Sequence, residues 1–139
     1  MEADGARIYI IDETTANDSR TERLIRLARS YAAEEAMPLP QTLCIAKGEY
    51  GKPYFENAPW LRFSVSHSGG LWVCALCRCD VGIDIEQHAA RDHAALARRF
   101  FHPQEIEYTR RGGTGAFYSV WTAKESYVKL LGTGIGGSF

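Results

Sequence analysis

The chain has 139 residues, 45% of them hydrophobic, and its 16 Lys and Arg against 17 Asp and Glu give a formal net charge of −1. This composition is typical of one soluble globular domain, and the balanced charge argues against nucleic acid or an anionic membrane as a partner recruited by bulk charge. No apolar run approaches the roughly 20 residues of a membrane span, and the N-terminus lacks the basic and apolar regions of a signal peptide, so we expect a cytoplasmic protein.

The first part of the chain predicts strands around one amphipathic helix. Residues 7–11 are rich in β-branched and aromatic side chains, which favours a strand. Asp18 or Ser19 is suited to cap a helix running to about Met37, because apolar residues recur there at helical spacing until a proline follows. A second strand is predicted at 43–46.

Two further strands are predicted to form a hairpin. Residues 64–70, S-V-S-H-S-G-G, predict a polar, flexible loop, and residues 71–79 return as a strand. Cys74 and Cys77 on this strand have the C-x-x-C spacing of zinc and redox sites, and Cys79 follows them. Side chains alternate along a strand, so Cys74 and Cys77 face opposite sides and are predicted to be reduced thiols rather than ligands.

The remaining part of the chain predicts one strand and then helices. The expected elements are a strand at 81–86, a helix at 89–101, a helix start at Pro103, a flexible loop at 111–115 and a helix at 116–131 that Gly132 ends.

Carboxylates are concentrated in V-G-I-D-I-E, residues 81–86. On a strand, Asp84 and Glu86 face one side while the valine and isoleucines face the core. Mg²⁺ takes one or two carboxylates and completes its shell with water and substrate phosphate, so this pair suits it. An acidic strand face in solvent explains the same pattern, and D-x-E alone leaves both interpretations open.

The helix W-T-A-K-E-S-Y-V-K, residues 121–129, carries Glu125 and Lys129 four positions apart on one face, with Trp121 one turn earlier. The pair can be a simple surface ion pair. Alternatively, Glu125 joins the strand carboxylates and Lys129 contacts a phosphate.

Two polar stretches add to this pattern. The sequence 64–70 concentrates hydroxyls, an imidazole and glycine N–H groups, which suit phosphate oxygens, and Lys52 adds an ammonium at a rigid G-K-P turn. Each stretch is weak alone. Three carboxylates, two lysines, a histidine and a glycine–hydroxyl stretch together indicate a divalent-metal site for a polyphosphate substrate.

In order and spacing these motifs resemble Sfp-type 4′-phosphopantetheinyl transferases of the holo-carrier-protein synthase superfamily. The resemblance runs from Ser19 to Phe139 and includes R-T at 20–21, Y-G-K-P-Y-F at 50–55, F-S-V-S-H-S at 63–68, G-I-D-I-E at 82–86, R-F-F-x-x-x-E at 99–105 and W-T-A-K-E-S-Y-V-K at 121–129. It implies an α+β fold of two similar halves. Residues 1–80 would carry the nucleotide and phosphate loops, and residues 81–139 the metal-binding strand and the W-x-x-K-E-x-x-x-K helix, with this second half incomplete.

The resemblance also implies an activity: Mg²⁺-dependent transfer of 4′-phosphopantetheine from coenzyme A to a serine of an apo acyl or peptidyl carrier protein, releasing 3′,5′-ADP. The metal ligands would be Asp84, Glu86 and Glu125, and the catalytic residues Glu125 and Lys129. Coenzyme A would be bound by Arg20, Thr21, Tyr50, Gly51, Lys52, Pro53, Ser66 and His67. The supporting residues would be Glu105, Trp121 and Lys124.

The chain departs from the family pattern at both ends. A longer basic segment usually precedes the Arg20 helix, and further strands usually follow the last helix. We therefore expect self-association through an open sheet edge, or a marginally stable monomer. Two alternative functions are a shortened relative that binds coenzyme A or a carrier protein without efficient turnover, and an unrelated Mg²⁺-dependent phosphohydrolase.

Overall fold

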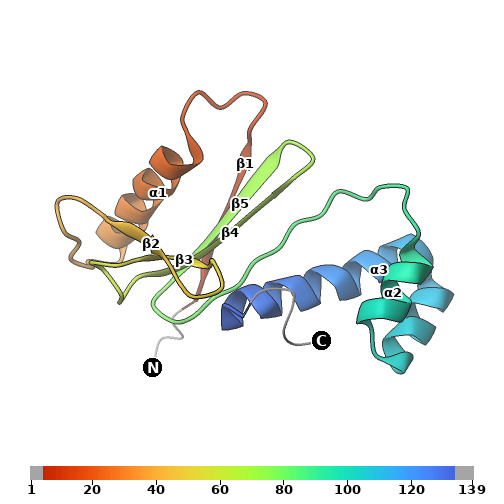
Figure 1. Cartoon of the computed structure of the whole chain (residues 1–139). Coiled ribbons are helices and arrows are strands. Elements are labelled where there is room, and N and C mark those ends of the chain that lie inside the picture. Colours follow the sequence, from red (N-terminus) through yellow and green to blue (C-terminus); the bar gives the residue numbers. More distant parts are fainter. Residues whose placement is uncertain (1–4, 134–139) are drawn as a thin grey trace.

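The structure is a computed structural model and describes residues 5–133. Its elements in chain order are β1 (Arg7–Asp12), α1 (Arg20–Glu34), β2 (Ile45–Lys47), β3 (Pro53–Phe55), β4 (Arg62–Ser68), β5 (Leu71–Cys77), α2 (His93–Phe100) and α3 (Pro103–Leu131) (Figure 1). Antiparallel strands combined with helices confirm the α+β class. No helix within residues 5–133 combines the length and the apolar composition that a membrane span requires.

A three-stranded antiparallel sheet in the order β1-β5-β4 forms the centre of the fold, and β2 and β3 form a separate hairpin. The turn between β4 and β5 consists of Gly69 and Gly70, which have φ of 58° and 81°, a backbone conformation that glycine adopts at little cost. The predicted polar loop at 64–70 is therefore wrong. Residues 64–68 belong to β4, because the glycine pair alone is enough to reverse the chain.

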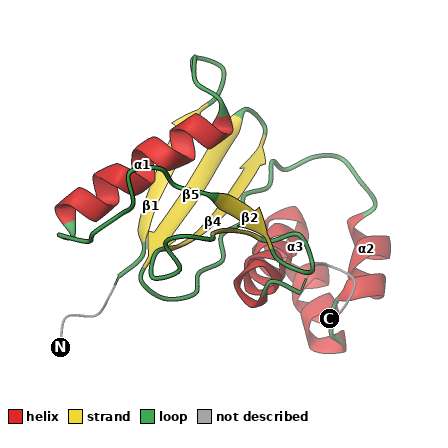
Figure 2. Cartoon of the chain, turned by 60° about the vertical axis from the view of Figure 1, so that its left-hand side comes forward, coloured by secondary structure: helices red, strands yellow, loops and turns green. Residues whose placement is uncertain are grey.

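Helix α1 lies across one face of this sheet (Figure 2). Ser19 caps it and forms a reciprocal capping box with Glu22, as the sequence favours. The helix ends at Glu34 rather than near Met37, because Ala36 takes a positive φ of 50° and turns the chain away. The buried core beneath α1 comprises Leu24, Leu27, Ala28, Tyr31, Ala32, Met37, Leu43, Phe55, Ala58, Leu61, Phe63, Trp72, Cys74 and Leu76.

The cysteines of β5 follow the predicted pattern. Cys74 is buried in the core beneath α1, and Cys77 is buried and contacts Cys79, with 2.9 Å between the two sulfur atoms. No disulfide joins the four cysteines, all of which lie within residues 5–133.

The opposite face of the sheet carries the serines of β4. Antiparallel pairing places Ser64 beside Ala75 and Ser66 beside Val73, and all four residues are buried. Residues 81–87 run alongside β4 in an extended conformation (Figure 1), yet they form no backbone ladder, so the predicted strand at 81–86 is wrong. Alternate N–H groups of this segment donate instead to serine side chains of β4.

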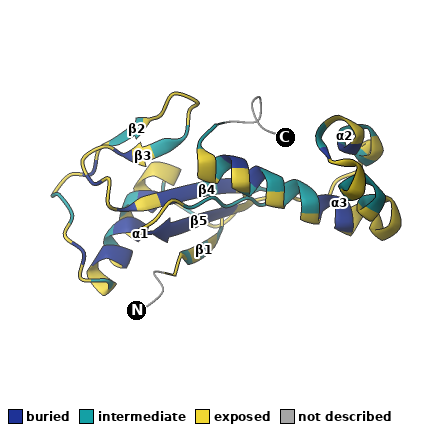
Figure 3. Cartoon of the chain, turned by 90° about the horizontal axis from the view of Figure 1, so that it is seen from below, coloured by how far each residue is buried: buried dark blue, intermediate teal, exposed yellow. Residues whose placement is uncertain are grey.

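Helices α2 and α3 form a helical hairpin with a small aromatic core of their own, Ala97, Phe101, Phe117 and Tyr118. Figure 3 shows that burial is concentrated in the sheet and in α1, whereas α2 and the first part of α3 are largely half-buried or exposed. Helix α2 begins at His93 instead of residue 89, since Asp92 supplies the N-terminal cap.

The predicted flexible loop at 111–115 is also wrong. Only Gly113 leaves the helical region, with φ 71° and ψ −154°, so α3 consists of two helical stretches that meet at a kink. The predicted end of the helix is confirmed: Gly132 adopts the left-handed conformation and its N–H bonds to the Val128 carbonyl.

Candidate active site

The segment 81–87 lies between β4 and the C-terminal part of α3. Its Gly82 packs against the backbone of α3 so tightly that a Cβ there would lie 1.9 Å from the Ser126 carbonyl oxygen and 2.5 Å from the Leu130 nitrogen. Three of its N–H groups reach the sheet: Ile83 donates to Ser64 Oγ at 3.1 Å, Ile85 to Ser66 Oγ at 3.3 Å and Gln87 to Ser68 Oγ at 2.9 Å. The sheet, the segment and α3 are thus stacked as three layers.

Asp84 is the most enclosed carboxylate of the segment, with 4% of its side chain exposed. Its Oδ1 accepts hydrogen bonds from Lys129 Nζ at 2.7 Å and from Ser66 Oγ at 3.1 Å. Its Oδ2 is buried and has no hydrogen-bond partner among the described residues. One oxygen is therefore fixed by the protein, and the other is left to bind a ligand.

Glu125 is 7% exposed, and its Oε1 is likewise buried without a partner in the described part of the chain. Burial raises the pKa of Glu125 above its ordinary value. The negative charges of Asp84 and Glu86 raise this pKa further, and the Lys129 ammonium opposes them. A buried acid of raised pKa beside a second carboxylate is typical of a functional site.

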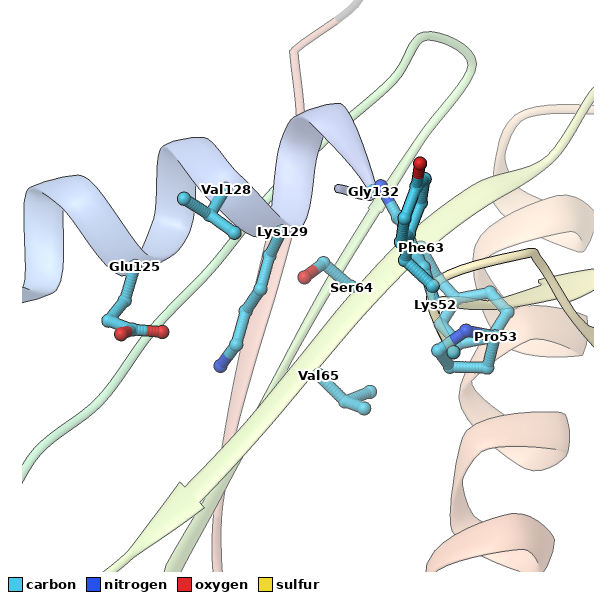
Figure 4. A pocket seen from close by; sticks show the side chains of 11 residues that line it. Lys52, Pro53, Phe63, Ser64, Val65, Glu125, Val128, Lys129 and Gly132 are labelled. Carbon is cyan, nitrogen blue, oxygen red and sulfur yellow. The ribbon is translucent and has the colours of Figure 1, made fainter. Parts of the chain in front are cut away.

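A hollow of about 350 Å³ is lined by residues of both the Y-G-K-P turn and the W-x-x-K-E-x-x-x-K helix. Its lining residues are Tyr50, Gly51, Lys52, Pro53, Phe63, Ser64, Val65, Glu125, Val128, Lys129 and Gly132. Glu125 and Lys129 leave the same side of α3, while the Y-G-K-P turn lies near the end of that helix (Figure 4). The structure thereby places four predicted coenzyme A residues and both predicted catalytic residues around one hollow.

Glu86 lines a different hollow, together with His88, Tyr118 and Thr122. Within residues 5–133, no three His, Cys, Asp or Glu side chains stand close enough to hold a metal ion together. The three-carboxylate ligand set stays a prediction. Among the described residues, Asp84 and Glu125 are the two carboxylates that each have one buried oxygen without a hydrogen-bond partner.

Lys52 makes a contact that the sequence did not predict. Its Nζ donates to the Val81 carbonyl at 3.1 Å and to the Leu130 carbonyl at 3.2 Å, so it links the start of the segment to the last turn of α3. Burial lowers the pKa of Lys52 below its ordinary value. The carbonyls of a helix C-terminus attract a cation, which explains this placement.

The other predicted coenzyme A residues lie outside the lining of that hollow. Ser66 is buried beneath Asp84, and His67 is exposed on the opposite side of β4. Arg20 is paired through two hydrogen bonds with Glu13, at 2.9 and 2.7 Å, and Thr21 is exposed beside it at the start of α1.

The three supporting residues stabilise the helical hairpin. Glu105 accepts from the His102 N–H at 2.8 Å and pairs with Lys124 at 2.9 Å. Burial acts to raise the pKa of Glu105, but the Lys124 ammonium and the His102 N–H together bring it below the ordinary value. Trp121 stacks on Phe117, with 5.8 Å between ring centroids.

Ser64 is a site residue that the sequence reasoning missed, because it was assigned to a solvated loop. The signal was present: serines recur at 64, 66 and 68, every second position of the strand, which places three hydroxyls on one strand face.

Comparisons with known proteins agree with this site. Residues 80–139 match the 4′-phosphopantetheinyl transferase superfamily. The chain is 36% identical over 113 residues to a 4′-phosphopantetheinyl transferase of Bacillus subtilis, covering 78% of this chain and 50% of that protein. It is 34% identical over 113 residues to 4′-phosphopantetheinyl transferase gsp of Aneurinibacillus migulanus, and the match covers 78% of this chain and 46% of that protein. A putative 4′-phosphopantetheinyl transferase of Synechocystis is 36% identical over 124 residues, and the match covers 81% of this chain and 50% of that protein.

This α+β fold groups Glu125, Lys52 and Lys129 around one hollow. Taken with the matches, it shows that the chain belongs to the 4′-phosphopantetheinyl transferase superfamily, and its relatives are of the Sfp type. The chain spans about half the length of the curated relatives it matches.

Proposed function

We propose that the chain transfers the 4′-phosphopantetheine arm of coenzyme A, with Mg²⁺, to a serine of an acyl or peptidyl carrier protein. The observation that carries the proposal is the pair of buried carboxylate oxygens that have no partner within the described residues, Asp84 Oδ2 and Glu125 Oε1, beside Lys129. Glu125 and Lys129 line a hollow that the Y-G-K-P turn also lines. The relatives named 4′-phosphopantetheinyl transferases support the same reaction.

The donor set fits Mg²⁺. Two unpartnered anionic oxygens in a buried site are costly unless a cation or proton satisfies them, and Mg²⁺ binds through one or two carboxylates. Asp84 and Glu125 would bind the ion, with Glu86 as a third ligand. When bound, the ion neutralises charge on the pyrophosphate of coenzyme A.

The reaction is a phosphoryl transfer in which the protein mainly positions and neutralises the reactants. The carrier serine oxygen bonds to the β-phosphorus, and the bond from that phosphorus to the bridging oxygen breaks, releasing 3′,5′-ADP. Where Glu125 is not itself a ligand of the ion, it would accept the serine proton, and its raised pKa suits a general base better than an ordinary carboxylate. Lys129 would neutralise charge that develops on the phosphoryl oxygens.

The remaining residues would bind the substrate. Tyr50, Gly51 and Pro53 would border the adenine, and Lys52 and His67 would contact phosphates. Ser66, Arg20 and Thr21 are the other proposed contacts to coenzyme A.

The test is incubation of the chain with coenzyme A, Mg²⁺ and an apo carrier protein, followed by intact-mass measurement of the carrier and chromatography of the nucleotide. We expect the carrier to gain the mass of phosphopantetheine and 3′,5′-ADP to appear. An unmodified carrier with intact coenzyme A would indicate a binding protein without turnover. Loss of coenzyme A without modification of the carrier would indicate a phosphohydrolase.

A further inference from the structure

Residues 81–87 are attached to the sheet by side chains instead of by a backbone ladder. The N–H groups of residues 83, 85 and 87 donate to the hydroxyls of Ser64, Ser66 and Ser68, respectively, at 2.9 to 3.3 Å. The N–H and C=O groups of a sheet lie in its plane, so they cannot bond to a chain stacked on the sheet's face. Serine hydroxyls project from the face and can make these bonds.

Two of these hydroxyls are buried. Ser64 and Ser66 lie on the covered face of β4, where a polar atom without a partner would destabilise the fold. Each accepts one main-chain N–H, which satisfies the serine and the segment together. A purely apolar strand face would leave the segment's N–H groups without these acceptors.

Ser66 has a second bond that reaches the candidate active site. Its Oγ donates to Asp84 Oδ1 at 3.1 Å while it accepts the Ile85 N–H at 3.3 Å. The same Oδ1 accepts from Lys129 Nζ, which leaves Oδ2 as the unpartnered oxygen. The serine thus fixes the backbone and the carboxylate orientation of one site residue.

The register of the segment has two independent restraints. Alternate N–H groups match alternate serines, so a shift by one residue would break every one of these bonds. A shift by two residues would move Gly82 from its place against α3, where a Cβ would lie 1.9 Å from a carbonyl oxygen. Only one register satisfies both restraints, and it places Asp84 beside Lys129.

We propose that Ser64, Ser66 and Ser68 are positioning residues: a hydroxyl row that sets the position and register of residues 81–87, and with them Asp84 and Glu86. The consequence for catalysis rests on the proposed function, since it assumes that these carboxylates hold the metal. The structural part does not depend on it.

Amide hydrogen exchange of the full chain, followed by NMR, tests the structural part. In Ser64→Ala and Ser68→Ala we expect the amide facing the lost hydroxyl, at Ile83 or Gln87, to exchange at least about tenfold faster. Amides of β5 should be unchanged, and so should all amides in the control Ser30→Ala, at an exposed position of α1. Ser68→Thr, which keeps a hydroxyl at a half-buried position, should retain protection. Unchanged exchange at both amides would overturn the proposal.

Mn²⁺ binding to the protein alone, measured by electron paramagnetic resonance, tests the link to the site without any turnover. We expect Ser64→Ala and Ser68→Ala to weaken Mn²⁺ binding at least threefold and to lower kcat more than they change the KM for coenzyme A. Faster exchange with unaltered Mn²⁺ affinity and kcat would refute the positioning role. Wild-type protein that binds no Mn²⁺ would contradict the proposed metal site, and the exchange result would then decide the inference alone. Ser66 is left out of this test because it is also a proposed coenzyme A contact.

Discussion

The two regions of the molecule are held together in different ways. In residues 7–77, strands pair through backbone ladders and α1 covers a continuous apolar core. In residues 81–133, an extended segment is held by serine hydroxyls and by Lys52, and two helices share a small aromatic core. The candidate active site lies where these regions meet. Stability should therefore depend mainly on the first region, and activity on the accuracy of the contact between them.

The largest effect on activity is expected from Asp84→Ala. Within residues 5–133, Asp84 carries one of the two buried carboxylate oxygens without a hydrogen-bond partner, and it accepts a hydrogen bond from the Lys129 ammonium. Its loss therefore removes a proposed ligand and displaces a proposed catalytic cation. We expect transfer to fall at least about 100-fold while the circular dichroism spectrum stays that of the folded protein. The measurement is the rate at which the carrier protein gains mass.

Asp80→Ala is the matched control, because Asp80 precedes the segment and, among the described residues, its ion pair is an exposed one with Arg62 at 3.6 Å. It should leave the rate within about twofold of the wild type. Near-normal transfer in Asp84→Ala would contradict the assignment of the site.

Gly82→Ala should disturb the contact between the regions directly. The added methyl group would meet backbone atoms of α3, which cannot rotate away, so the helix and the segment must separate. We expect a loss of about 1–3 kcal/mol in the free energy of unfolding and a fall of at least about tenfold in kcat. Urea denaturation and steady-state kinetics measure the two effects.

Gly115→Ala provides the comparison, because a Cβ at this helical position meets no atom within 4 Å. It should stabilise α3 by about 0.5–1 kcal/mol and leave kcat unchanged. Equal behaviour of the two alanine variants would show that the contact at Gly82 is not needed for activity.

The same comparison explains what the sequence could predict. Local patterns were sufficient for the start of α1 at its Ser19 cap, for the chain reversal before β5 and for the end of α3 at Gly132, because each depends on neighbouring residues. The grouping of Lys52 with Glu125 and Lys129 also followed from the motifs, through the resemblance that they carry.

The errors came from tertiary contacts. The alternation in 81–86 is identical for a strand in a ladder and for an extended chain bonded to serines, and only the position of β4 beneath it separates the two. Glycines predict a break at 111–115, but packing of the following aromatic residues keeps all except Gly113 helical. The cation–carbonyl contacts of Lys52 depend on where α3 ends in space.

Arg23→Met should lower stability while leaving activity nearly unchanged, the reverse of the effect expected for Asp84→Ala. The Arg23 side chain is 2% exposed, pairs with Glu13 and Asp18 at 3.0 Å each, and lies 5.0 Å from the Trp72 ring centroid. Methionine fills similar space but leaves both carboxylates without this partner, so we expect a loss of about 2–3 kcal/mol in urea denaturation. The kcat of folded protein should change less than twofold.

Arg26→Met is the control, since Arg26 is 60% exposed and contacts only Asp18 in the described structure. Its cost should stay below about 1 kcal/mol. A similar loss in both variants would mean that burial of the Arg23 pair has no special effect.

The dependence of the free energy of unfolding on pH should also reflect the ion pairs of Arg23. Hydrogen bonds from Arg20 and then Arg23 lower the pKa of Glu13 from 4.5 to about 2. Because the pKa is depressed in the folded state, this stabilisation is present above pH 4.5 and is lost as the pH falls toward 2. The wild type should therefore lose stability steeply in this window, and Arg23→Met less steeply. Equal slopes in pH-dependent urea denaturation would contradict the role of Arg23.

His67→Ala and Lys52→Met should both weaken the binding of coenzyme A, and the difference between them is informative. His67 is exposed on β4, so its loss should remove only a proposed phosphate contact and raise the KM for coenzyme A by up to about tenfold, with kcat unchanged. Lys52 also joins the Val81 and Leu130 carbonyls, so its loss should raise KM, lower kcat and destabilise the fold by about 1–2 kcal/mol. Steady-state kinetics with varied coenzyme A, together with urea denaturation, distinguish these patterns. If Lys52→Met changes KM alone, the lysine binds substrate without joining the two regions; if His67→Ala changes kcat alone, the histidine does not contact a phosphate in the bound substrate.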